Sequence, residues 1–141
     1  VNVFISIHFF FLKLGSMLCP PGKEFNVTLS SYFPDRSFEN VENGMSDIKR
    51  NKLQTLQDFV DGRTEYVTAA MDSSLQLPYG TKVCVPWLNK HYNKDILFEI
   101  RDSCSDLTGA GYSRLDVCVR TEEDSYDLAV NRRATLIFRE N

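Results

Sequence analysis

The sequence predicts an all-β fold, a six-stranded barrel, from three observations. From Phe25 onward the apolar residues recur with a period close to two, in short runs separated by turn-forming residues. Six such runs suit a closed barrel, in which no strand edge is left open to aggregation. The 141 residues allow one domain with one core. We therefore expect a single barrel domain over residues 24–141.

The predicted strands follow one another with one long interruption. Between the first and second strands, four apolar residues are spaced like one face of a short helix, which Gly62 is placed to end. They are Leu53, Leu56, Phe59 and Val60. We expect this helix to cover one end of the barrel. The strands are expected at residues 26–33, 66–71, 82–87, 96–101, 115–120 and 135–139.

Residues 1–18 indicate an exported leader. They are mostly apolar and aromatic, with interruptions at His8, Lys13 and small residues. The run is shorter than the roughly 20 apolar residues that span a bilayer, so it fits a signal peptide better than a membrane anchor. We expect a secreted protein without a stable membrane span. The alternative is a buried N-terminal strand.

The cysteines number four, and an even count after a leader predicts an oxidising compartment with up to two disulfides. Cys104 lies two residues after Asp102, so a strand would point both side chains to the same face. A disulfide there would shape a groove. The alternative is that all are small buried apolar side chains. The cysteines are Cys19, Cys84, Cys104 and Cys118.

Composition disfavours several classes of function. The net charge of −3 comes without a basic stripe, so nucleic-acid binding is not expected. His8 and His91 are isolated, and no glycine-rich phosphate loop is found. We therefore expect neither a metal nor a cofactor, and we expect a monomer.

Asp72, Asp102 and Asp116 are placed alike, each at the edge of a predicted strand. A single carboxylate at a strand end often caps a turn. Three of them in one closed barrel are expected to meet around a groove, where repulsion raises the pKa of at least one. A carboxyl group with a raised pKa stays protonated near neutral pH and can act as a general acid.

Four segments, in order, carry a resemblance to a known family: YVTAAMD, LPYGTKVCVP, FEIRD and GYSRLDVCV. They resemble the three-aspartate (3D) domain family, whose fold is a six-stranded double-psi β-barrel. The resemblance covers roughly the last three-quarters of the chain. The family's barrel is similar to the catalytic barrel of membrane-bound lytic transglycosylase A and more distantly to expansins. The resemblance therefore implies a double-psi barrel with an acidic groove.

The resemblance also implies roles. Asp116 matches the acid/base of the lytic transglycosylase barrel, and Asp102 matches the residue that lies beside it in the groove. Asp72 would hold the site together and bind the substrate without reacting. Asp116 would protonate the glycosidic oxygen of a β-1,4-linked glycan. A lytic transglycosylase then closes an anhydro ring through the sugar's own 6-hydroxyl, whereas a hydrolase needs Asp102 to activate water. Where the family has Gly-Gly after the second aspartate, this chain has Ser103 and Cys104.

Three further residues are candidates for substrate binding. Trp87 and Tyr112 offer rings on which the C–H face of a sugar can stack, and Arg114 offers a cation to a carboxylate or a substrate acid. The alternatives are core packing for the aromatic residues and a solvated surface position for the arginine.

The function expected from these residues is cleavage of peptidoglycan or a related β-1,4 polysaccharide, with Asp116 and Asp102 as the catalytic pair. The alternative is a non-catalytic barrel that binds a polysaccharide, as expansins do, or that inhibits a protein.

Overall fold

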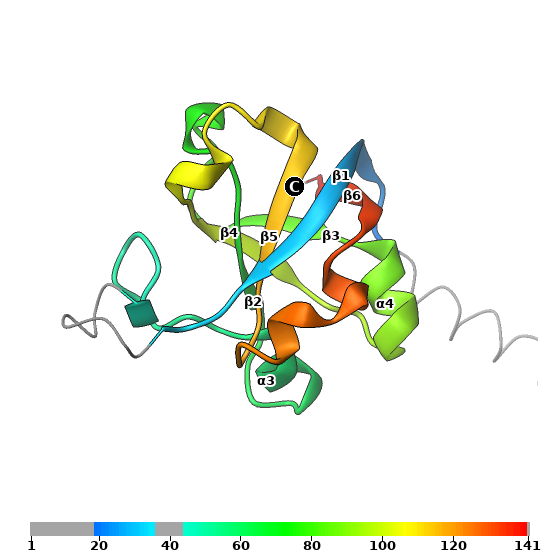
Figure 1. Ribbon diagram of the computed structural model, residues 1–141. Helices are drawn as coiled ribbons and strands as arrows, with labels where there is room; N and C mark the ends of the chain where they lie inside the picture. The colour runs from blue at the N-terminus through cyan, green and yellow to red at the C-terminus, as the bar shows by residue number, and fades with distance from the viewer. Residues whose placement is uncertain (1–18, 36–43, 141) are drawn as a thin grey trace, which may run out of the picture.

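The computed structural model describes residues 19–35 and 44–140, so the predicted leader over residues 1–18 lies outside it. Six strands close into a barrel in the order β1-β5-β2-β4-β3-β6 (Figure 1). The all-β class and all six predicted strands are confirmed. The strands are β1 (Gly22–Tyr32), β2 (Val67–Ala70), β3 (Thr81–Cys84), β4 (Phe98–Asp102), β5 (Arg114–Cys118) and β6 (Arg133–Arg139).

The strand pairing is mixed. β1 has two partners: from Gly22 to Thr28 it runs antiparallel to β6, and from Thr28 to Tyr32 it runs parallel to β5. β2 is parallel to β4 and antiparallel to β5, and β3 is antiparallel to both of its neighbours. This closed barrel is compatible with the double-psi fold that the resemblance implies.

Alternate residues of each strand face the core. On β5, Leu115 and Val117 are fully buried in the hydrophobic cluster, and Asp116 between them points to the other side of the sheet. On β2, Val67 and Ala69 are buried in the same way. The other side of these strands carries the polar residues Thr68 and Asp116, and both are also covered from solvent.

The short helix predicted in the first long connection is confirmed as α3 (Leu56–Val60). The Thr55 hydroxyl caps its start by accepting the Asp58 N–H at 3.1 Å, and the chain turns away at Gly62, where φ is +79°. Leu56 is fully buried in the barrel core. Figure 1 shows α3 at one end of the barrel and the yellow turn before β5 at the other.

A second helix, α4 (Pro86–Tyr92), replaces the end of the third predicted strand. β3 ends at Cys84 instead of residue 87, because Pro86 opens a helix whose first turn tolerates a proline nitrogen. Leu88 packs into the core, and Asn93 ends the helix with φ of +54°. Among the described residues, no helix is both long and apolar enough to cross a membrane.

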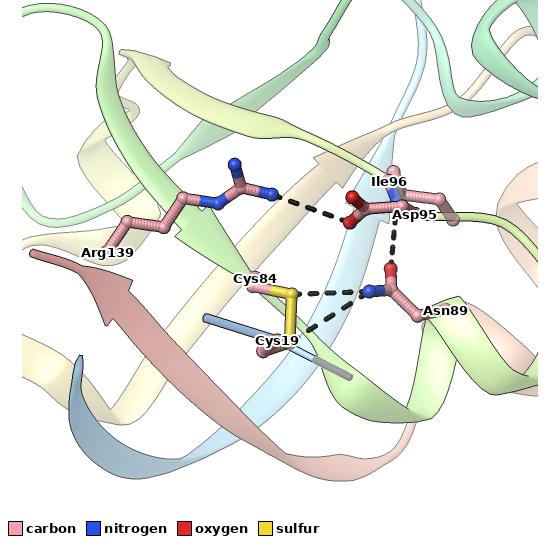
Figure 2. The surroundings of a disulfide bond; sticks show 6 residues. All are labelled: Cys19, Cys84, Asn89, Asp95, Ile96 and Arg139. Carbon is pink, nitrogen blue, oxygen red and sulfur yellow. Dashed lines mark hydrogen bonds and ion pairs between the residues drawn. A yellow bond between two sulfur atoms is a disulfide. The ribbon is translucent and has the colours of Figure 1, made fainter. Parts of the chain in front are cut away.

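A disulfide joins Cys19, just before β1, to Cys84 at the end of β3 (Figure 2). The Asn89 side-chain amide donates toward the Cys84 sulfur at 3.3 Å, and its oxygen accepts the Ile96 N–H at 3.0 Å. The bond therefore fixes the start of β1 to the corner between β3 and α4. One disulfide is found in the described part of the chain; Cys104 and Cys118 are free.

This disulfide is expected to contribute substantially to stability. It joins residues 65 apart in the chain, and a loop of that size corresponds to roughly 4 kcal/mol in the chain-entropy model. The double variant Cys19→Ala, Cys84→Ala should lose about this much unfolding free energy in denaturant titrations. Cys104→Ala, at an exposed free cysteine, serves as the control. Equal unfolding midpoints for the double variant and the wild type would contradict the expectation.

Candidate functional site

An open pocket of about 480 Å³ lies against the outer side of β1, β5, β2 and β4. Two of the three predicted aspartates, Asp102 and Asp116, line it together with Arg114. The opposite wall comes from the segment 44–53. The structure thus brings together the two residues for which a catalytic role was predicted, in a pocket with access from solvent.

The strand register explains why these two carboxyl groups meet. Ala70 of β2 pairs with Asp102 of β4 on one side and with Asp116 of β5 on the other. Asp116 in turn pairs with Ser30 of β1. Paired residues on neighbouring strands share a face, so the four side chains form one row across the sheet. Ala70 fills little space at the centre of this row, and two strand spacings place the two aspartate backbones roughly 10 Å apart.

A β-bulge turns Asp102 toward this row. Ala69 pairs with Ile100 but Ala70 pairs with Asp102, so Arg101 is an extra residue in β4. Strict alternation would place Asp102 on the same side as Ile100, which is buried in the core. The bulge moves it by one position, and bulges of this kind often re-aim side chains near active sites.

Asp102 is partly buried at the end of β4. Burial raises its pKa; the hydrogen bonds from the Tyr32 hydroxyl at 3.0 Å and from the Ser103 N–H at 3.0 Å act in the opposite direction, and the charge of Asp47 adds to the rise. An increase in the pKa of one aspartate was expected from repulsion among the three predicted aspartates, but the charge that contributes at Asp102 is that of Asp47. The main cause of the increase is desolvation.

Asp116 has a different environment. Its Oδ1 atom accepts a hydrogen bond from the Ser30 hydroxyl and lies 3.3 Å from Nη2 of Arg114. The other guanidinium nitrogen of Arg114 donates to the carbonyl of Asp106 at 3.2 Å, which fixes the direction of the cation. Asp116 lies in the middle of β5 and is only 7% exposed.

Tyr32 links β1 to the end of β4 and was not identified from the sequence. Burial, together with the neighbouring Cys118 and the two pocket aspartates, raises the pKa of its hydroxyl well above the ordinary value. The hydroxyl therefore stays protonated and donates to Asp102. Cys118, its register partner on β5, is buried, and burial also raises the pKa of this thiol.

Asp72 does not line this pocket. It follows β2, and its carboxylate accepts the N–H of Ser74 at 3.0 Å, of Gly109 at 3.0 Å and of Gly111 at 2.9 Å. These backbone hydrogen bonds, led by that of Ser74, lower the pKa of Asp72. Gly109 and Gly111 both have positive φ, a conformation that glycine adopts without strain. Asp72 therefore holds the turn that leads into Arg114 and Asp116.

Asp72→Asn is expected to destabilise the fold in a pH-dependent way. Because the pKa of Asp72 is lower in the folded chain, its contribution is present above the unfolded pKa of about 3.9 and is lost as pH falls through the folded value. The melting temperature of the variant should lie several degrees below the wild type near pH 7, and the gap should close in acid. Asp106→Asn, exposed near the same turn, is the control. A gap that is constant with pH would contradict this role.

The two predicted aromatic candidates lie elsewhere. Trp87 is on α4, where its Nε1 donates to the Ala129 carbonyl at 3.1 Å and its ring lies 3.7 Å from the Arg132 guanidinium. Tyr112 stacks on Phe25 with ring centres 4.3 Å apart. The structure does not bring either residue to the carboxylates. Among the described residues, the aromatic side chains that line the pocket are those of Tyr32 and Phe33.

The wall formed by residues 44–53 was also not identified from the sequence. Asp47 organises it: its Oδ1 accepts the N–H groups of Lys49 at 2.9 Å and Asn51 at 3.0 Å, and its Oδ2 accepts the hydroxyl of Tyr79. The Arg101 guanidinium donates to the same hydroxyl at 3.3 Å. These contacts fix the wall to the bulged strand β4.

Within residues 19–35 and 44–140, no group of three or more His, Cys, Asp or Glu side chains is placed to hold a metal ion. A comparison of the sequence with protein-family models finds no match. None of the curated proteins matches it either.

Proposed function

We propose that the pocket binds a polysaccharide and cleaves its β-1,4 glycosidic bonds by acid/base catalysis. The observation that carries this proposal is that Asp102 and Asp116 line one open pocket, on strands flanking Ala70, in unequal surroundings. Burial raises the pKa of Asp102, whereas Asp116 is paired with the cation of Arg114. Two carboxyl groups with different environments are suited to different roles in glycoside cleavage.

In this proposal Asp102 is the acid. It donates its proton to the glycosidic oxygen, the bond electrons move to that oxygen, and an oxocarbenium-like centre forms at the anomeric carbon. The Asp116 carboxylate offsets this positive charge. The Asp102 carboxylate then takes the proton of the sugar's 6-hydroxyl as that oxygen bonds to the anomeric carbon. An anhydro ring closes and Asp102 is protonated again.

The allocation of roles differs from the one that the resemblance implies, in which Asp116 is the acid. The surroundings favour Asp102 as the acid, because a proton donor needs a pKa near the working pH. Burial raises the pKa of Asp102 toward that range. Asp116 already accepts a hydrogen bond from Ser30 and an ion pair from Arg114.

The Cys19–Cys84 disulfide fits an oxidising compartment, and we include secretion in the proposal. Extracellular polysaccharides such as peptidoglycan or chitin are then the substrates to test.

Asp102→Asn should lower product formation from peptidoglycan or chitin by at least about 100-fold, because an amide cannot donate the proton at this position. Asp116→Asn should slow the reaction while leaving some activity. Products are measured by mass spectrometry, where anhydro ends indicate lytic cleavage and reducing ends indicate hydrolysis by a water that Asp116 activates. Asp95→Asn, at an exposed aspartate outside the pocket, is the control. Equal product formation by Asp102→Asn and the wild type would remove Asp102 from the mechanism.

Tyr32→Phe should move the pH dependence of the reaction. The Tyr32 hydroxyl lowers the pKa of Asp102 by stabilising its carboxylate, so its removal raises that pKa further. Activity falls as pH rises through the pKa of the acid, and this descending limb should shift to higher pH in the variant. Tyr112→Phe, outside the pocket, should leave the profile unchanged. A limb that stays in place or moves to lower pH contradicts the assignment of Asp102.

The second candidate function is polysaccharide binding without cleavage. It is favoured by the contacts of the two carboxyl groups, because Oδ1 and Oδ2 of Asp102 and Oδ1 of Asp116 already accept hydrogen bonds from the protein. Retention of the protein on insoluble chitin or peptidoglycan without any product, unchanged in Asp102→Asn, would favour this function over catalysis.

A further inference from the structure

A second depression, of about 610 Å³, continues the pocket beyond the end of β1. Phe33, Asp35 and Leu53 line both hollows, so the surface between the two is shared. The far wall comes from the start of α3 and from the chain after β5. Side chains found only in the second depression include Pro34, Met45, Lys52, Arg120 and Glu122.

The lining of this second depression mixes apolar and polar side chains. Phe33, Pro34 and Met45 provide apolar surface. Lys52 and Glu122 provide hydrogen-bonding groups of opposite charge. A sugar ring has an apolar C–H face and a rim of hydroxyls, and sites of this mixed character suit such a ligand.

The second depression carries no excess of positive charge, because Asp35, Asp58 and Glu122 line it together with Lys52 and Arg120. Arg120 reaches Asp58 at 2.7 Å and Asp61 at 2.6 Å, so its cation is already paired. Lys52 is accompanied by Glu122. The carboxylate pocket, by contrast, carries several acidic side chains and one arginine. A strongly anionic chain would meet repulsion in the first hollow and no excess of cations in the second, so the lining favours a neutral ligand.

The junction is rigid on both flanks. The carbonyl of Tyr32, just before Phe33, accepts the Val119 N–H at 2.8 Å, and the N–H of Asp35, just after Pro34, donates to the Gly44 carbonyl at 2.9 Å. Phe33 itself packs against the barrel core. The residue that joins the two hollows is therefore held in place before any ligand arrives.

We infer that the second depression is an extension of the binding groove that holds further units of a neutral β-linked glycan chain. The ligand is then a polymer lying across both hollows, with the bond to be cleaved at Asp102 and Asp116. This inference rests on the proposed function of the carboxylate pocket.

The test compares binding of cello- and chito-oligosaccharides of two to six units by titration calorimetry. The affinity of the full chain should rise by roughly tenfold or more between two and six units as the chain fills the second depression. Lys52→Trp places a bulky ring in that depression only. It should remove this gain and leave the affinity for the disaccharide within about twofold of the wild type. Lys94→Trp, at another exposed lysine outside both hollows, is the matched control.

Equal affinities for two and six units, or a full length-dependent gain in Lys52→Trp, would overturn the extension while leaving the carboxylate pocket as the site of action. Binding with the expected length dependence but without products would support the extension and contradict catalysis. Absence of binding by any of the oligosaccharides would overturn both.

Discussion

The pairing of Ala70 with Asp102 on one side and Asp116 on the other is the constraint on which the site depends. A six-stranded barrel allows a polar residue on its outer side at many positions, but here two such residues meet across one small side chain. The row requires three strands in register and a bulge at Arg101, because without the extra residue Asp102 would face the core with Ile100. The site is therefore a consequence of strand register.

Closure of the barrel supplies the second requirement, which is unequal surroundings for two chemically identical groups. Tyr32 reaches from β1 to Asp102 because β1 runs parallel to β5 and its last residue pairs with Cys118, two residues beyond Asp116. Arg114 lies two residues before Asp116 on the same strand and face, so its cation is always near that carboxylate. One strand order thus places one carboxyl group against the Tyr32 hydroxyl and the other against the Arg114 cation. A buried carboxyl group costs stability when it ionises, and a functional site commonly carries such a cost.

The sequence predicted the parts of this structure that depend on periodicity. Alternating apolar residues indicated all six strands, and the spacing of Leu56 and its neighbours indicated α3. It did not indicate α4, because Val83 to Trp87 continues an apolar run and Pro86 suits either a strand end or a first helical turn. The alternation of apolar residues does not indicate the bulge at Arg101. The direction of the Asp102 side chain is therefore evident only from the structure, in which Ala70 pairs with Asp102. Residue type alone points to Trp87 and Tyr112 as ring platforms, but their position relative to the pocket is set by α4 and by stacking on Phe25.

The wall formed by residues 44–53 connects the shape of the groove with its chemistry. Leu53, at the end of this wall, lines both hollows. Asp47, at its centre, holds the segment by accepting hydrogen bonds from the Tyr79 hydroxyl and from the Lys49 backbone N–H. The same Asp47 carries a negative charge that raises the pKa of Asp102. Because Arg101, next to Asp102, donates to the Tyr79 hydroxyl, the wall and the bulged strand share one set of contacts. Detachment of this wall would widen the groove and also remove a charge that favours the protonated form of Asp102. Groove width and the proton affinity of the acid are therefore coupled through one surface segment, which makes Tyr79 and Asp47 positioning residues although neither lines the carboxylate pocket.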